Sequence, residues 1–101
     1  MTPSAPALQN LIEKAKDDLT KRLSITATEI NVAKAAEVTW PDSSLGCPQE
    51  GMLYAQILTP GYLILLEYAN NLYEYHAGRG SAVIYCTNPT PPLPDTPPAN
   101  K

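Results

Sequence analysis

The chain has 101 residues, ten of them acidic and seven basic, and a net charge of −3. A length of this order allows one domain with a small core. The acidic balance argues against nucleic-acid binding and against an anionic membrane surface, and no apolar run approaches the roughly 18 residues of a spanning helix.

The first residues, MTPSAPALQNLIEKAKDD, lack the basic and apolar regions of a secretory signal. A cytoplasmic location is therefore expected by default. The two cysteines weaken that expectation, because an even pair in a small domain can also form a disulfide in an oxidising compartment. An exported protein whose signal has been removed is the alternative.

The N-terminal segment is expected to be an amphipathic helix from about Ser4 to Leu23. Its leucines, isoleucine and alanine recur at spacings of three and four residues, which gives one apolar stripe. Charged pairs four residues apart form the solvated side of this helix. The following SITATEI predicts a short helical turn, because Thr26 and Glu29 have the spacing of a capping box.

Four segments follow that read as strands and turns. NVAKAAEVTW, from Asn31 to Trp40, is predicted to be a strand, although its alanines also favour a helix. MLYAQIL, residues 52–58, is a second strand candidate. TPGY, residues 59–62, suits a type II turn, after which YLILLEYA, residues 62–69, doubles back as a strand.

Asn70 and Asn71 predict a hairpin turn, since both tolerate a positive φ. This register places Glu67 opposite Glu74 and predicts one shared face that packs beneath the helix. GRGSAVIYC, residues 78–86, supplies a last turn and a short strand that ends at Cys86. The residues on the shared face are Tyr62, Ile64, Leu66, Tyr68, Tyr73 and Tyr75.

The final segment, TNPTPPLPDTPPANK, is too rich in proline to continue a sheet and is predicted to be a disordered tail over residues 87–101. Its PPLP resembles polyproline ligands, but a plain terminus is the preferred interpretation. Residues 1–86 are expected to form one α+β domain, in which the N-terminal amphipathic helix packs on a small antiparallel sheet of about four strands.

The two cysteines lie at the ends of predicted elements, Cys47 after the first strand and Cys86 at the end of the last. A structural disulfide between them would close a loop of about 40 residues and add roughly 4 kcal/mol in the loop-entropy model. Two separate thiols and a reactive cysteine are the alternatives. No Cys-x-x-Cys spacing supports thiol exchange.

His76, the single histidine, is predicted to share a face with Glu67 and Glu74. Such a cluster could bind a metal or act as acid and base. An exposed sheet face with a charge-compensated histidine is the preferred interpretation, and fewer than four convincing ligands are in sight. No metal and no cofactor are therefore predicted. No serine lies in a nucleophile elbow, so no enzymatic activity is predicted either.

The loop from Trp40 to Gly51 holds the most unusual residues of the chain. Prolines, glycines and short polar side chains all have shape-holding roles there. A rigid loop is also a preorganised binding element, because it is ordered before the partner arrives. The candidate binding residues are Trp40, Asp42, Ser43, Ser44, Leu45 and Gln49.

The preferred functional interpretation is a non-enzymatic binding or regulatory module that presents this loop to a protein partner of unknown identity. One alternative is a small enzyme or metal-binding protein centred on His76 with Glu67 and Glu74. A structural subunit that docks through exposed leucines is a third; these leucines are Leu63, Leu65 and Leu72.

The segment VTWPDSSLGCPQEGMLYAQILTPGY, with ILLE, YEYH and a closing Cys, resembles an uncharacterised family of small bacterial domains, many of them exported or lipid-anchored. Their signature is Trp-Pro-Asp-x-Ser-Leu-Gly-Cys-Pro, and the resemblance covers Val38 to Cys86. It implies a stand-alone α+β module, a Cys47 to Cys86 disulfide, and a pattern that includes Tyr75 and His76. It implies no catalytic or ligand residue. This chain departs from the pattern at Glu50, where a proline is usual, and in lacking an export signal.

Overall fold

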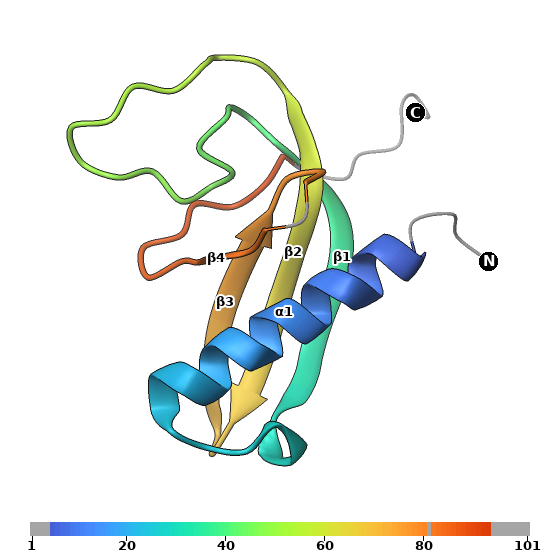
Figure 1. Cartoon of the computed structure of the whole chain (residues 1–101). Helices are drawn as coiled ribbons and strands as arrows, with labels where there is room; N and C mark the ends of the chain where they lie inside the picture. The colour runs from blue at the N-terminus through green and yellow to red at the C-terminus, as the bar shows by residue number, and fades with distance from the viewer. Residues whose placement is uncertain (1–4, 81, 94–101) are drawn as a thin grey trace.

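A single helix lies across one face of a four-stranded antiparallel sheet in the computed structural model of the chain (Figure 1). The structure describes residues 5–80 and 82–93. The strand order is β1-β2-β3-β4, so each strand pairs with its neighbour along the chain. This arrangement confirms the predicted α+β class. The elements are α1 (Ala5–Leu23), the 3-10 turn η1 (Ala27–Glu29), β1 (Asn31–Trp40), β2 (Thr59–Tyr68), β3 (Asn71–Ala77) and β4 (Ile84–Tyr85).

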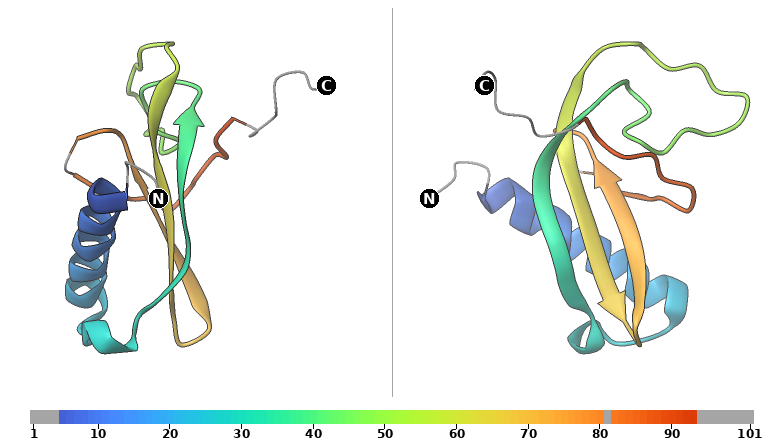
Figure 2. Two further views of the ribbon diagram at one scale, coloured as in Figure 1. Left: turned by 90° about the vertical axis from the view of Figure 1, so that its right-hand side faces the viewer. Right: turned by 180° about the vertical axis from the view of Figure 1, so that it is seen from behind.

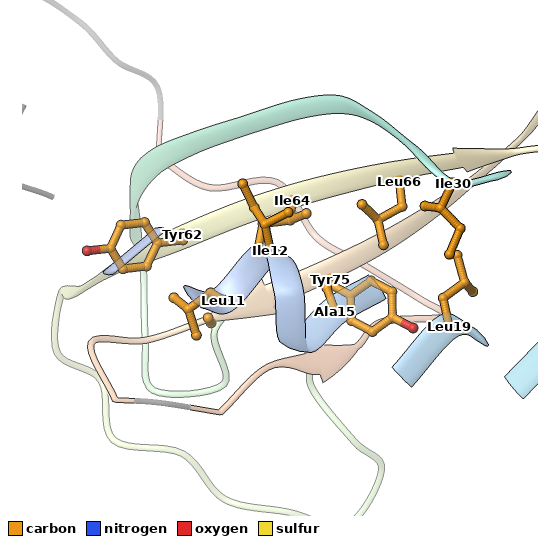
Figure 3. Close-up of a cluster of buried hydrophobic side chains, with 10 residues drawn as sticks. Leu11, Ile12, Ala15, Leu19, Ile30, Tyr62, Ile64, Leu66 and Tyr75 are labelled. Atoms are coloured by element: carbon orange, nitrogen blue, oxygen red, sulfur yellow. The ribbon is translucent and has the colours of Figure 1, made fainter. Parts of the chain in front are cut away.

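The main core lies between α1 and the face of the sheet that the helix covers, which we call the near face (Figure 3). Apolar residues at spacings of three and four form one side of α1, and alternate residues of β2 and β3 meet them. The predicted face is therefore confirmed for Tyr62, Ile64, Leu66 and Tyr75. Tyr73 packs against this core partly buried, and Tyr68 is not one of its members. The buried members are Leu11, Ile12, Ala15, Leu19, Ile30, Tyr62, Ile64, Leu66, Tyr75 and Ala77.

A polar contact ties the helix to the sheet. The hydroxyl of Tyr75 donates to Oδ2 of Asp18 at 2.7 Å, and Nε of Arg22 donates to the same oxygen. Burial alone would raise the pKa of Asp18, but these two donors outweigh it and lower that pKa. Burial, and then the hydrogen bond to Asp18, raise the pKa of Tyr75. The pair thus favours an ionised Asp18 and a neutral Tyr75.

The short elements before the hairpin confirm part of the prediction. The turn after the helix forms as η1, but Thr26 makes no side-chain hydrogen bond at its N-cap, so the capping box is absent. The strand over Asn31–Trp40 forms as predicted. Among the residues that the structure describes, no helix is long and apolar enough to cross a bilayer.

Two predicted elements between β1 and the hairpin are wrong. Residues 52–58 form no strand and instead run as irregular backbone. Residues 59–62 form no turn, because they begin β2 and pair with the end of β1. Pro60 pairs only with Thr39 of β1, because the pairing of β2 with β3 begins at Tyr62 and Ala77, and a strand edge of this kind tolerates proline.

The predicted hairpin register is wrong by one residue in the turn. Ala69 and Asn70 adopt the positive φ values, 52° and 69°, and Tyr68 pairs with Asn71. Each residue of β2 consequently pairs two positions earlier on β3 than expected. An even shift leaves the faces unchanged, but it places Glu67 opposite Leu72 rather than opposite a second glutamate.

The Tyr75→Phe substitution should lower the free energy of unfolding by about 1 kcal/mol at neutral pH, since it removes the hydrogen bond to Asp18. The low folded-state pKa of Asp18 stabilises the fold above the unfolded carboxyl pKa of about 4, and this stabilisation is lost as the pH falls below it. The difference between the two proteins should therefore shrink in acid. Urea unfolding at several pH values measures it.

Tyr73→Phe is the matched control, because Tyr73 lies on the same strand and face but outside the contact with Asp18. If both variants lost the same free energy of unfolding at every pH, the hydrogen bond from Tyr75 to Asp18 would not be the cause.

Candidate functional site

The face of the sheet away from α1, the far face, is covered at one end by the loop that follows β1 and by the residues that follow β4 (Figure 2). Side chains from these segments meet the strands in a second buried group. We call it the far-face cluster, and its members are Trp40, Gly46, Cys47, His76 and Cys86.

Trp40 ends β1 and is fully buried. Its Nε1 donates to the carbonyl oxygen of Ala77 at 3.1 Å, so the indole reaches across β2 to β3. The ring crosses at Gly61, where an added Cβ would lie 2.8 Å from Nε1 and 2.0 Å from the Ala77 oxygen. The indole also stacks on the imidazole of His76, with ring centroids 4.2 Å apart. Only glycine at position 61 permits this crossing.

The loop closes over the indole at Gly46. An added Cβ there would lie 2.6 Å from Cζ3 of Trp40, and its φ of +74° is one that side chains rarely adopt. The carbonyl of Gly46 accepts a hydrogen bond from the backbone N–H of Thr90, and the N–H of Leu93 donates to Thr39. Residues 87–93, predicted to belong to a mobile tail, thus lie along the domain. Residues 94–101 lie outside the described residues.

The disulfide joins Cys47 in the loop to Cys86 after β4, with the two Cα atoms 5.6 Å apart. The predicted pairing is confirmed. The backbone N–H of Cys86 donates to the carbonyl of Glu74, which extends the ladder between β3 and β4 by one step. The cross-link therefore fastens the loop to a position that the sheet already holds.

His76 is fully buried, so the predicted exposed face around it is wrong. Nδ1 lies 2.6 Å from the carbonyl oxygen of Leu45, and Nε2 lies 2.5 Å from Oε2 of Glu74. The carbonyl of Leu45 accepts from Nδ1, because a carbonyl oxygen only accepts. The carboxylate of Glu74 accepts from Nε2, and Glu67 takes no part in this contact.

Short polar side chains fix the shape of the loop as the sequence predicts. Oδ1 of Asp42 accepts hydrogen bonds from the hydroxyl and the backbone N–H of Ser44, and these bonds lower the pKa of Asp42. Ser43 binds Ala55 twice, through its backbone N–H and its hydroxyl oxygen. The Trp40 to Gly51 loop thereby holds residues 52–58 at Ala55.

The six predicted binding residues fall into three groups. Trp40 and Ser44 are buried and act as anchors, whereas Asp42 and Leu45 are half-buried. Ser43 and Gln49 are exposed. Only the last two offer much surface to a partner.

Sequence reasoning missed the most exposed apolar surface, which lies on residues 52–58. The sequence predicts a strand over these residues, yet no partner strand pairs with them. The exposed fractions of its large apolar residues are 57% for Met52, 96% for Leu53, 62% for Ile57 and 65% for Leu58.

Of the three leucines expected to be exposed for docking, only Leu72 is exposed. Leu63 is buried on the far face, which corrects the expectation, and Leu65 is half-buried.

The Gly61→Ala substitution should destabilise the protein by about 3 kcal/mol or more, because the new methyl group meets backbone and indole atoms that cannot both move. Fluorescence of Trp40, the single tryptophan, should also change as the indole leaves His76. Chemical unfolding monitored by fluorescence and circular dichroism measures both effects. Gly80→Ala is the control, because an added Cβ there meets nothing within 4 Å. Equal stability of the two variants would refute the role assigned to Gly61.

Comparison with known proteins gives one match. A search of curated proteins and a search of solved structures found none. A family model described as a domain of unknown function (DUF8738) matches residues 12–86, a span that includes the loop, both cysteines and His76. The chain belongs to this family.

Proposed function

We propose that this protein is a non-enzymatic binding or regulatory module that presents the Trp40 to Gly51 loop, together with the adjoining residues 52–58, to a protein partner. The observation that carries the proposal is the set of large apolar side chains exposed on residues 52–58. They extend from a base that the disulfide and the buried Trp40 hold in place.

The exposed apolar area of residues 52–58 is the main source of binding free energy in this proposal. Burial of one leucine-sized side chain contributes about 1.5–3 kcal/mol, so a partner that covers several of them gains substantially. Exposed Ser43 and Gln49 can add hydrogen bonds at the rim. The anchored base lowers the ordering cost of association, because part of the loop is already held before binding.

The alternative, a small enzyme or metal-binding protein centred on His76 with Glu67 and Glu74, has less support. His76 is closed from solvent, and its imidazole contacts Glu74 alone of the two glutamates. The geometry favours the loop as the working surface.

Source and compartment also belong to the proposal. The resemblance of residues 40–48 to the signature of small bacterial domains supports a bacterial origin. Disulfides persist in oxidising compartments, so the Cys47–Cys86 bond supports an exported protein over a cytoplasmic one.

A double substitution, Leu53→Ser with Ile57→Ser, tests the proposal. A pull-down from lysate of the source organism, quantified by mass spectrometry, should show a specific protein retained by the wild type and depleted at least tenfold by the variant. A tenfold loss of binding corresponds to about 1.4 kcal/mol, which is less than the free energy expected from burying either side chain.

Leu72→Ser is the matched control, because Leu72 is 60% exposed but lies on β3, outside the loop. It should retain the partner. Identical protein profiles for the wild type and the double variant would contradict the proposal.

A further inference from the structure

We propose that, once the disulfide is reduced, Cys47, His76 and Cys86 bind a thiophilic divalent cation of the zinc class, which replaces the disulfide as the cross-link. Their ligand atoms all lie within 4.8 Å of one another, and all three residues are buried. The sequence analysis weighed His76 only with Glu67 and Glu74, whereas the fold brings two sulfur atoms to the imidazole.

The distances suit a tetrahedral ion. Zinc binds sulfur at about 2.3 Å and imidazole nitrogen at about 2.0–2.1 Å, so its ligand atoms lie roughly 3.5–3.8 Å apart. Nδ1 of His76 already lies 3.2 Å from Sγ of Cys47. Reduction separates the two sulfur atoms in any case, because unbonded sulfurs cannot remain at bonding distance, and this movement brings them toward the tetrahedral spacing.

Glu74 supplies the support that a metal-binding histidine needs. Its Oε2 lies 2.5 Å from Nε2 of His76, the ring nitrogen that faces away from the cysteines. An N–H at Nε2 that donates to a carboxylate fixes the ring orientation, and Nδ1 binds the ion once its own proton has left. The carbonyl oxygen of Leu45 lies 2.6 Å from Nδ1 and can take a fourth position once the Nδ1 proton has left.

The ligand positions do not depend on the disulfide alone. The N–H of Cys47 donates to the carbonyl of Ser44, and the N–H of Cys86 donates to Glu74. Next to Cys47, the carbonyl of Gly46 accepts from the N–H of Thr90. These backbone bonds flank each cysteine, so we expect the loop to stay close to β3 when the sulfur bond opens.

The charge of the ligands and the access from solvent to the sulfur atoms also suit a divalent cation. Two thiolates neutralise a divalent cation, which removes most of the cost of placing an ion in a buried site. A surface hollow of about 60 Å³ is bordered by both Cys47 and Cys86. A reductant or a metal ion can therefore approach the sulfurs from outside.

The chemistry balances in two steps. A dithiol reductant gives two electrons and two protons to the Cys47–Cys86 bond, becomes a disulfide itself and leaves two thiols in the protein. Binding of the cation then releases both thiol protons and the Nδ1 proton of His76 to solvent. The proton on Nε2 stays and donates to Glu74.

Titration of the reduced full chain with Co²⁺ tests the proposal. The chain is first treated with a dithiol reductant, which is removed just before the measurement. Thiol titration first verifies two free thiols. We expect one Co²⁺ per chain, sulfur-to-cobalt charge-transfer absorption, quenching of Trp40 fluorescence because the indole stacks on His76, and displacement by Zn²⁺. The oxidised chain should show none of these signals.

Variants separate this site from adventitious binding. Cys47→Ser should abolish the charge-transfer band at the Co²⁺ concentrations that saturate the wild type. Glu74→Gln should weaken Co²⁺ binding by about 10–100-fold, as loss of a supporting carboxylate does elsewhere. Glu67→Gln is the matched control on the neighbouring strand and should leave affinity unchanged.

Three outcomes would overturn the proposal: a folded, reduced chain without the charge-transfer band, a band retained in Cys47→Ser, or equal weakening in the Glu74 and Glu67 variants. If the reduced chain unfolds, which circular dichroism reports, one equivalent of Co²⁺ must restore the folded signal, and failure to do so also overturns it. The proposal is independent of partner binding, since none of these measurements uses the partner.

Discussion

The contact between the Trp40 indole and the backbone at Gly61 is the constraint on which the far side of this domain depends. Because position 61 has no side chain, the indole crosses β2, donates to β3 and stacks on His76. The loop then closes on the ring at Gly46, and Cys47 reaches Cys86. Without the crossing, the loop would lose the indole surface against which Gly46 packs.

Burial on both faces explains how so short a chain supports a sheet. The helix covers the near face, and the loop with residues 87–93 covers one end of the far face. Strand β2 is consequently buried on both sides from Gly61 to Ile64, a pattern that belongs to strands enclosed between layers. A small core gains from this second layer and from the cross-link that closes it.

Among the residues that the structure describes, every buried side-chain nitrogen or oxygen atom has a hydrogen-bond partner, which offsets the cost of burying it. His76 has Leu45 on one ring nitrogen and Glu74 on the other, and Tyr75 has Asp18. The neighbouring residues 75 and 76 point to opposite faces, so a single strand carries one polar contact into each layer. Residues 52–58, by contrast, carry several of the most exposed apolar side chains.

The sequence by itself determined the helix, the strand faces and the choice of Cys47 and Cys86 as a pair, because periodicity and the family resemblance are properties read along the chain. Only the tertiary structure decided the hairpin register, the burial of His76 and the exposure of residues 52–58. Each of these features depends on contacts between residues that are far apart in the sequence. A turn shifted by one residue places Glu67 opposite Leu72 instead of Glu74. The Trp40 indole, which lies across Gly61, buries the face around His76 that the sequence predicts to be exposed.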